Sequence, residues 1–276
     1  MKWWSAPAKI NLFLHITGQR SDGYHELQTA FQFLDYCDYL SFEHTFNDEI
    51  QLLTPIDGIE HKDNLIVRAA KLLQDYVGIN KGVLIAIEKN LPMGGGLGGG
   101  SSNAATTLIA LNHIWNCQLS TEQLAQLGLD LGADVPVFIH GHAAWAEGVG
   151  EKLTVISPPE PWYMVIVPDC HVSTAEIFSS PQLTRDCRSI TISRFLSGEG
   201  KNVCEDVVRN SYPPVAEALD WLSNHAEPKM TGTGSCVFAD FKSQFQAQQV
   251  LAMLPKGWHG FIAKGCNTSP LTQCIT

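Results

Sequence analysis

The feature that most constrains this chain is a run of six glycines within the seven positions 94–100. A short apolar segment at 83–87 precedes the run, and helical spacing resumes over 103–115, so the order is strand, glycine loop, helix. Glycine adopts backbone angles that leave N–H groups free to point inward. In a helix that begins near Ser101, the unpaired N–H groups and the positive end of the dipole face the same anion. The segment can therefore wrap a chain of phosphates.

Two familiar phosphate motifs and one ligand-free alternative compete for this tract. The spacing of Gly94, Gly96 and Gly99 fits a dinucleotide pattern, but almost any polyglycine tract does. A P-loop ends in Gly-Lys-Ser/Thr, whereas this loop ends with Ser101 and Ser102 and has no lysine. A flexible or tightly packed loop without a ligand is the other interpretation, and the density of glycines favours the ligand. The phosphate-neutralising cation must then come from elsewhere, and the two serine hydroxyls are placed to contact a phosphate or Mg²⁺.

Composition narrows the classes of partner. The 276 residues are 45% hydrophobic and 17% charged, which suits one large core or two modest ones, and we expect two domains. A formal net charge of −10 opposes binding to nucleic acid or to an anionic membrane. We find no export signal and no uninterrupted apolar window of about 18 residues, so we expect a cytoplasmic protein. The eight cysteines are scattered and predicted to be reduced, and no zinc-type spacing predicts a dedicated metal site.

The first half reads as a β-rich opening followed by helices. Clean alternation over 8–16 predicts a half-buried strand, a polar turn follows at 19–25, and 27–34 and 39–44 predict two further strands. A helical stripe covers 64–77, with Asn64 as a plausible cap. A capping box beginning at Ser120 predicts a helix that Gly132 ends.

A proline cluster at 158–161 is the strongest linker signal, so the domains are predicted to span 1–157 and 158–276. Beyond the linker, the patterns predict five elements and one glycine-bearing turn. These are a strand from 162 to 167, a helix near 214–225, a turn at 231–235, a strand at 236–241, a helix at 244–254 and a strand at 260–264.

Two charged residues stand in apolar surroundings. Lys9 lies on the polar face of the first strand together with Asn11, and taken alone it is equally well a lysine at a solvent edge. Asp134 follows a predicted helix end inside apolar sequence, where a carboxylate needs a partner or a purpose, although capping the next turn would suffice. Paired with a lysine, it could orient or deprotonate a hydroxyl that attacks phosphorus.

Three segments together resemble the GHMP kinases, the superfamily of galactose, homoserine, mevalonate and phosphomevalonate kinases. The segment 7–12 (PAKINL) resembles the first motif of the family, 91–102 its ATP loop, and 229–235 (KMTGTGS) its third motif. The resemblance extends over almost the whole chain. It implies an α+β, two-domain GHMP kinase fold, with an N-terminal ribosomal-S5-like domain, a C-terminal α+β domain, and the active site in the cleft between them.

The same resemblance implies which residues bind ATP and which carry the phosphoryl transfer. Asp134 would be the base and Lys9 its electrostatic partner, and Mg²⁺ would arrive as MgATP. Asn64 and Lys89 would lie near the adenine. The loop contacts would come from Pro92, Met93, Gly94, Gly95, Gly96, Leu97, Gly98, Gly99, Gly100, Ser101 and Ser102.

Within the superfamily, segments 22–25 (DGYH), 132–136 (GADVP) and 173–178 (STAEIF) resemble the branch whose acceptor is a methylerythritol carrying a cytidine diphosphate, in non-mevalonate isoprenoid synthesis. The resemblance implies that the cytosine stacks between Tyr24 and Phe178, that His25 reads its edge, and that Asn11 and Thr174 position the acceptor. Ser179 stands where a lysine is expected. A mevalonate or homoserine kinase, and an inactive nucleotide- or sugar-binding regulator, are the alternatives, and a monomer and a homodimer both stay open.

Overall fold

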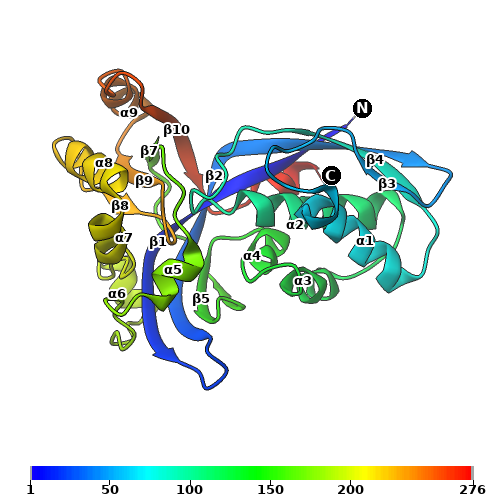
Figure 1. Ribbon diagram of the computed structural model, residues 1–276, viewed down its shortest axis with the longest axis horizontal. Helices are drawn as coiled ribbons and strands as arrows, with labels where there is room; N and C mark the ends of the chain where they lie inside the picture. Colours follow the sequence, from blue (N-terminus) through cyan, green and yellow to red (C-terminus); the bar gives the residue numbers. More distant parts are fainter. Residues whose placement is uncertain (1, 275–276) are drawn as a thin grey trace.

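The computed structural model describes residues 2–274. Two long antiparallel strands, β1 (Trp3–Gln19) and β2 (His25–Thr45), run along the long axis in the right-hand part of Figure 1 and bend downward toward their hairpin at the left. The strand predicted over 8–16 is present in β1, but the prediction that only one of its faces is buried is wrong. Lys9 and Asn11, on the supposedly polar face, are only 3% and 4% exposed. They are covered because the glycine loop and the turn at Thr231 pack on that face. Lys9 Nζ donates to the Gly96 carbonyl, and the Asn11 N–H donates to the Thr231 hydroxyl.

Strand β2 is one continuous strand where the sequence predicted two. Residues 35–38, between the two predicted strands, include two aspartates. In the structure, Asp35 accepts a hydrogen bond from the backbone N–H of Lys264, and Asp38 accepts bonds from the N–H groups of Asn90 and Leu91. These acceptors are satisfied by distant segments, so the strand continues through them.

Strand β2 organises the sheet because its two edges serve different partners. Strand β1 pairs along one edge, and the other edge is shared in succession by three antiparallel strands, β5 (Ala144–Gly148), β10 (His259–Cys266) and β4 (Gly82–Glu88). The remaining strands extend the sheet from these. They are β3 (Ile50–Leu52) on β4, β6 (Lys152–Val155) on β5, β7 (Trp162–Val167) on β10, β9 (Val237–Phe241) on β7 and β8 (Lys229–Met230) on β9.

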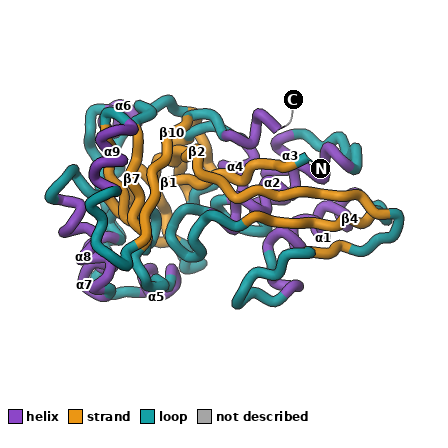
Figure 2. The backbone as a smooth tube through the Cα atoms, turned by 90° about the horizontal axis from the view of Figure 1, so that it is seen from above, coloured by secondary structure: helices purple, strands orange, loops and turns teal. Residues whose placement is uncertain are grey.

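Four helices gather beside the sheet at one end of the molecule (Figures 1 and 2). They are α1 (Leu65–Val77), α2 (Gly99–Ile114), α3 (Thr121–Leu129) and α4 (Val135–His140), and a short 3-10 helix (His61–Asp63) precedes them. Asn64 caps α1 by accepting from the Ile66 N–H, and the predicted capping box at Ser120 is present. Helix α3 ends at Leu129, three residues before the expected stop at Gly132.

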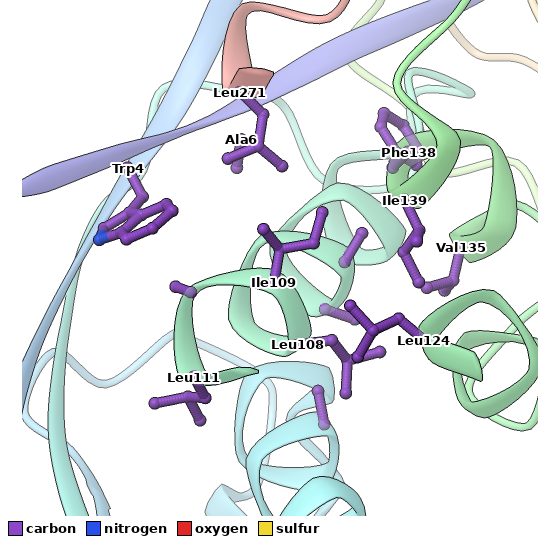
Figure 3. Packing of buried hydrophobic residues seen from close by; sticks show 14 of the residues in the cluster. Trp4, Ala6, Leu108, Ile109, Leu111, Leu124, Val135, Phe138, Ile139 and Leu271 are labelled. Carbon is purple, nitrogen blue, oxygen red and sulfur yellow. The ribbon is translucent and has the colours of Figure 1, made fainter. Parts of the chain in front are cut away.

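The core at this end is built around α2. Leu108 and Ile109 from α2, Phe138 from α4 and Trp4 from β1 belong to one buried cluster, which also includes Leu271 from the C-terminal 3-10 helix (Pro270–Cys274) (Figure 3). The end of the chain therefore returns to the first half. This contact is one that the order of elements along the sequence does not suggest.

The other end holds a second core between the sheet and α8 (Pro213–Ser223) and α9 (Gln244–Leu251). These helices and strands β7, β9 and β10 were predicted. Leu14 and Ile16 of β1 also belong to this core, so β1 contributes to both ends. The division after residue 157 stays a prediction. The elements not predicted are β3, β5, β6, β8, α4, α5 (Thr174–Ser179), α6 (Ile192–Leu196), α7 (Glu205–Ser211) and the two 3-10 helices.

Two further properties follow from the described residues. All eight cysteines lie within them and carry free thiols. No helix between residues 2 and 274 combines the length and the apolar character needed to cross a membrane.

Candidate active site

One cavity of about 710 Å³ is lined by segments from both ends of the molecule. The glycine loop forms one wall, β1 and the start of α1 contribute polar side chains, and the segment before α5 and the turn at 232–234 come from the second half. The site residues that the sequence predicted and that line this cavity are Lys9, Asn11, Asn64, Lys89, Pro92, Met93, Gly94, Gly95, Gly96, Leu97, Gly98, Gly99, Gly100, Ser101, Asp134, Thr174 and Phe178. Tyr24, His25 and Ser102 do not line it.

Lys9 is the buried cation of the cavity. Its Nζ donates to Asn11 Oδ1 at 2.6 Å and to the Gly96 carbonyl at 3.1 Å, and it lies 3.3 Å from Asp134 Oδ2. An ammonium has three donors, and these three acceptors match them. The missing cation of the glycine loop is therefore supplied by β1.

Asp134 precedes α4 but does not cap it. It occupies the N-cap position without a side-chain hydrogen bond to the helix, and its carboxylate faces Lys9 instead. Its side chain is 36% exposed while that of Lys9 is 4% exposed. One oxygen of the Asp134 carboxylate is thus held beside the buried Lys9 ammonium, and the carboxylate stays accessible from the cavity. A residue that orients or deprotonates a hydroxyl needs this access.

The carbonyls of three successive residues in the glycine loop are engaged by the rest of the protein. The Gly95 carbonyl accepts from Cys236 N–H at 3.1 Å, the Gly96 carbonyl accepts from Lys9 Nζ and from Thr231 Oγ1, and the Leu97 carbonyl accepts from Lys9 N–H at 2.9 Å. Among residues 2–274, the N–H groups of residues 94–98 donate no backbone hydrogen bond, so they are available to an anion. This is the arrangement of a backbone anion site.

Positive φ angles at Gly96 and Gly98, 76° and 71°, make that turn possible. Gly98 is the N-cap of α2, and its carbonyl accepts from Ser102 N–H, which leaves the preceding first-turn N–H groups without acceptors in the helix. Ser102 Oγ and Asn103 Oδ1 are buried and have no hydrogen-bond partner among residues 2–274. Asn103 lines the cavity and was not among the predicted site residues, although it immediately follows the serines of the loop.

The entrance to the loop is held by Asp38, another residue that sequence reasoning missed. Its Oδ1 accepts the N–H groups of Asn90 and Leu91, each at 2.8 Å, and its Oδ2 pairs with Lys89 Nζ at 2.6 Å. Asp38 is fully buried, whereas the Lys89 side chain is 24% exposed and lines the cavity. The argument applied to Asp134, that a carboxylate in apolar sequence needs a partner, also applies to Asp38.

The second half contributes threonines. Thr231 is buried and its hydroxyl accepts from Asn11 N–H at 3.0 Å while donating to the Gly96 carbonyl at 3.1 Å. Thr174 Oγ1 lies 2.9 Å from Thr233 Oγ1 at the cavity wall. The three segments that carry the family resemblance therefore meet at one place.

The aromatic residues lie at one margin of the cavity. The rings of His25 and Phe178 are stacked, with centroids 5.1 Å apart and planes at 28°, and Phe178 lines the cavity. Tyr24 is 65% exposed in the turn before β2. Burial and, secondarily, the charge of Arg185 lower the pKa of His25 below its usual 6.5.

Cys236, whose N–H bonds to the Gly95 carbonyl of the loop, is buried. Burial raises the pKa of its thiol to about 12, so this cysteine is not a nucleophile at neutral pH.

Comparison with protein families gives two matches within the chain. The model of the GHMP kinases N terminal domain matches residues 64–142, and that of the GHMP kinases C terminal matches residues 188–260. Among curated relatives, a 4-diphosphocytidyl-2-C-methyl-D-erythritol kinase of Nitrosococcus oceani is 59% identical over 275 residues, which cover 100% of this chain and 98% of that protein. The protein of the same name from Shewanella sp. (strain W3-18-1) is 58% identical, over 97% of this chain and 95% of its own.

Solved structures show the same likeness. A crystal structure of 4-(cytidine 5'-diphospho)-2C-methyl-D-erythritol kinase superposes with a TM-score of 0.85 and 30% identity, over 96% of this chain and 99% of that one. A mevalonate kinase (TM-score 0.71, 17% identity, 97% and 100% coverage) and a homoserine kinase from Cytophaga hutchinsonii (0.64, 15%, 97% and 94%) share the fold.

Proposed function

The chain belongs to the GHMP kinases, and on that premise we propose that it uses ATP to phosphorylate the C2 hydroxyl of 4-diphosphocytidyl-2-C-methyl-D-erythritol, in isoprenoid precursor synthesis. The expected α+β fold with N- and C-terminal GHMP domains is confirmed. The observation that carries the proposal is the contact of Lys9 Nζ with both the Asp134 carboxylate and the Gly96 carbonyl. This contact supports the assignment of Asp134 as the base and of Lys9 as the cation beside the loop proposed to bind the phosphates.

The reaction assigned to this geometry is an in-line displacement. The C2 oxygen of the acceptor bonds to the γ-phosphorus, the bond from that phosphorus to the β,γ-bridging oxygen breaks, and ADP leaves. Asp134 takes the hydroxyl proton, while Lys9 stabilises the charge on the transferring group. The loop N–H groups hold the phosphates, so catalysis depends mainly on position and electrostatics.

Mg²⁺ is proposed to accompany ATP. The fit rests on an oxygen of the kind that Mg²⁺ prefers, because Asn103 Oδ1 at the start of α2 is buried and has no partner among the described residues. Ser101 and Asn103 line the cavity and are the residues that would approach the ion or its waters. The ion would neutralise phosphate charge.

The remaining roles are proposals of the same kind. Asn64 and Lys89 contact the adenosine end, and Asn11 and Thr174 position the acceptor. The cytosine stacks between Tyr24 and Phe178, with His25 at its edge. The proximity of His25 to Phe178 supports this arrangement.

The test is phosphoryl transfer from γ-labelled ATP with Mg²⁺ to a panel of alcohols: the cytidyl acceptor, mevalonate, homoserine and galactose. Label on the cytidyl acceptor alone, lost in Lys9→Ala and Asp134→Asn, is expected. Transfer to another alcohol would refute the acceptor while keeping the kinase. Nucleotide binding without transfer to any acceptor would indicate a regulator.

A further inference from the structure

The side chain of Arg185 makes four hydrogen bonds within the protein. Its guanidinium donates to the carbonyls of Phe178 at 2.8 Å, Ser180 at 2.8 Å and Leu183 at 3.1 Å. Its Nε donates to His25 Nε2 at 3.1 Å. One planar, partly buried cation thus joins the end of α5 and the following turn to the first residue of β2.

The bond to His25 determines where the imidazole proton lies. A guanidinium has five donors and no acceptor, and it does not deprotonate in proteins. His25 Nε2 must therefore accept, which places the proton of the neutral ring on Nδ1. Burial and the Arg185 charge lower the pKa of His25, in keeping with a neutral ring. Among residues 2–274, His25 Nδ1 makes no hydrogen bond, so its N–H is a free donor.

The His25 ring is held at its edge by Arg185 and on its face by Phe178. His25 stacks on Phe178, and Phe178 lines the cavity that contains the glycine loop. Since Arg185 also holds the Phe178 carbonyl, it fixes both partners of the stacked pair. His25 itself does not line the cavity, so its ring adjoins the cavity through Phe178, and Arg185 fixes the position of the free Nδ1–H beside that residue.

We propose that Arg185 is a positioning residue that makes the site select cytosine over uracil, by holding His25 as the Nδ1–H tautomer. The inference rests on the proposed function, because it presumes a pyrimidine at this margin. Cytosine N3 has a lone pair and no hydrogen, so it accepts from Nδ1–H. Uracil N3 carries a hydrogen, and two donors facing each other leave both unpaired.

The first test reads the tautomer directly and does not depend on activity. Nitrogen NMR of the protein labelled with ¹⁵N-histidine, with the His25 signals assigned by their loss in His25→Gln, distinguishes protonated from bare ring nitrogens. We expect Nδ1–H in the unaltered protein and a shift toward Nε2–H, the form that imidazoles prefer in water, in Arg185→Met. An Nε2–H ring in the unaltered protein would overturn the proposal whether or not the cytidyl compound is the substrate.

The second test measures discrimination with the cytidyl acceptor and its uridyl analogue. In Arg185→Met, we expect the cytidyl-to-uridyl ratio of kcat/KM to fall about 10-fold to 100-fold, through the acceptor KM, with the KM for ATP unchanged. Arg185→Lys, which keeps one donor for His25, should recover part of the ratio. Arg188→Met is the matched control, because Arg188 is exposed and its side chain makes no hydrogen bond or ion pair within residues 2–274.

Each outcome decides between a specific and a merely structural role. Equal losses for both acceptors, or a loss that extends to ATP, would mean that Arg185 only stabilises its loop, and would refute the proposal. If the unaltered protein phosphorylates neither acceptor, the proposed function fails, and the NMR result still decides the role of Arg185 in setting the tautomer.

Discussion

Gly96→Ala is the substitution for which the structure gives the sharpest expectation. Gly96 has φ of 76°, and a Cβ there would lie less than 3.0 Å from the Thr231 carbonyl oxygen, a backbone atom that no rotamer change can move. The left-handed conformation costs about 1–2 kcal/mol for alanine. Overpacking against a fixed neighbour costs about 1–3 kcal/mol more. The total strain is therefore about 2–5 kcal/mol.

This strain must appear in one of two measurements. If the loop keeps its conformation, the folded state carries the strain and the Tm falls by roughly 2–4 °C for each kcal/mol. If the free loop relaxes away from Thr231, it gives up the bonds that Lys9 and Thr231 make to the Gly96 carbonyl. Nucleotide binding must then restore the strained form, so the Kd for ATP rises, by about 30-fold for 2 kcal/mol.

Isothermal titration with MgATP and thermal unfolding of the same samples provide both readings. Gly99→Ala is the comparator within the same loop, because Gly99 has no positive φ and the nearest heavy atom to its Cβ would be at 3.4 Å, an ordinary contact. The rise in the Kd for ATP should be at least tenfold smaller in Gly99→Ala than in Gly96→Ala. If Gly96→Ala leaves both Kd and Tm at the level of the unaltered protein, the packing of this loop on Thr231 is not as described.

Three further substitutions test separate parts of the molecule. Asp134→Asn should lower kcat at least about 100-fold in steady-state assays and leave the calorimetric Kd for ATP within about threefold, and an unchanged kcat would remove Asp134 from the mechanism. Asp38→Asn should lower the free energy of unfolding, measured in urea, by about 2 kcal/mol. This is less than the usual cost of breaking a fully buried ion pair because Lys89 is partly exposed. An unaltered urea midpoint would contradict this expectation. Glu205 has a pKa raised by burial above its usual 4.5, so its carboxyl favours folding below pH 4.5 and loses that contribution as the pH rises through the folded pKa. Glu205→Gln, which retains an acceptor for the Met230 N–H, should therefore raise the Tm at pH 8 and lose this gain at pH 4, and a gain independent of pH would show that ionisation is not the cause.

The elements that the sequence predicted are those whose signals are local. Helix α1 carries an apolar stripe of several turns and an Asn64 cap, and α3 begins with a reciprocal capping box, so both appear where the pattern placed them. Helices α5 and α6 are also capped, by Ser173 and Thr191, but they span six and five residues. Such short helices complete too few turns to show an apolar period, which explains why they were missed.

The errors on β1 and β2 have a different origin. Lys9 was predicted to lie on the polar face of a half-buried strand, and Asp38 falls in the interval between two predicted strands. Lys9 and Asp38 are instead buried with partners supplied by the glycine loop and its entrance, which lie far away in the sequence. A pattern of two-residue period reports the polarity of a position but carries no information about which distant segment will cover it.

The candidate site was predictable to the extent that its residues belong to recurring motifs. Lys9, Asp134 and the loop were named from the sequence, and the structure brings them into contact. The roles of Asp38 and Arg185 were not deduced in the same way, because their partners, the backbone N–H groups and Lys89 side chain for Asp38 and the carbonyls and His25 ring for Arg185, are brought to them only by folding. Their importance lies in geometry, and only the folded chain displays it.

A single hydroxyl explains why the three motifs must act together. Thr231, from the second half, accepts from the Asn11 N–H of β1 and donates to the Gly96 carbonyl of the loop. The same carbonyl accepts from Lys9, whose remaining bonds reach Asn11 and Asp134. A displacement of the second half would therefore move the carbonyl that fixes the lysine, and with it the partner of the carboxylate. The Thr174 hydroxyl, proposed to position the acceptor, hydrogen-bonds to the Thr233 hydroxyl two residues beyond Thr231, so under that proposal a change in acceptor contacts would be transmitted to the loop geometry.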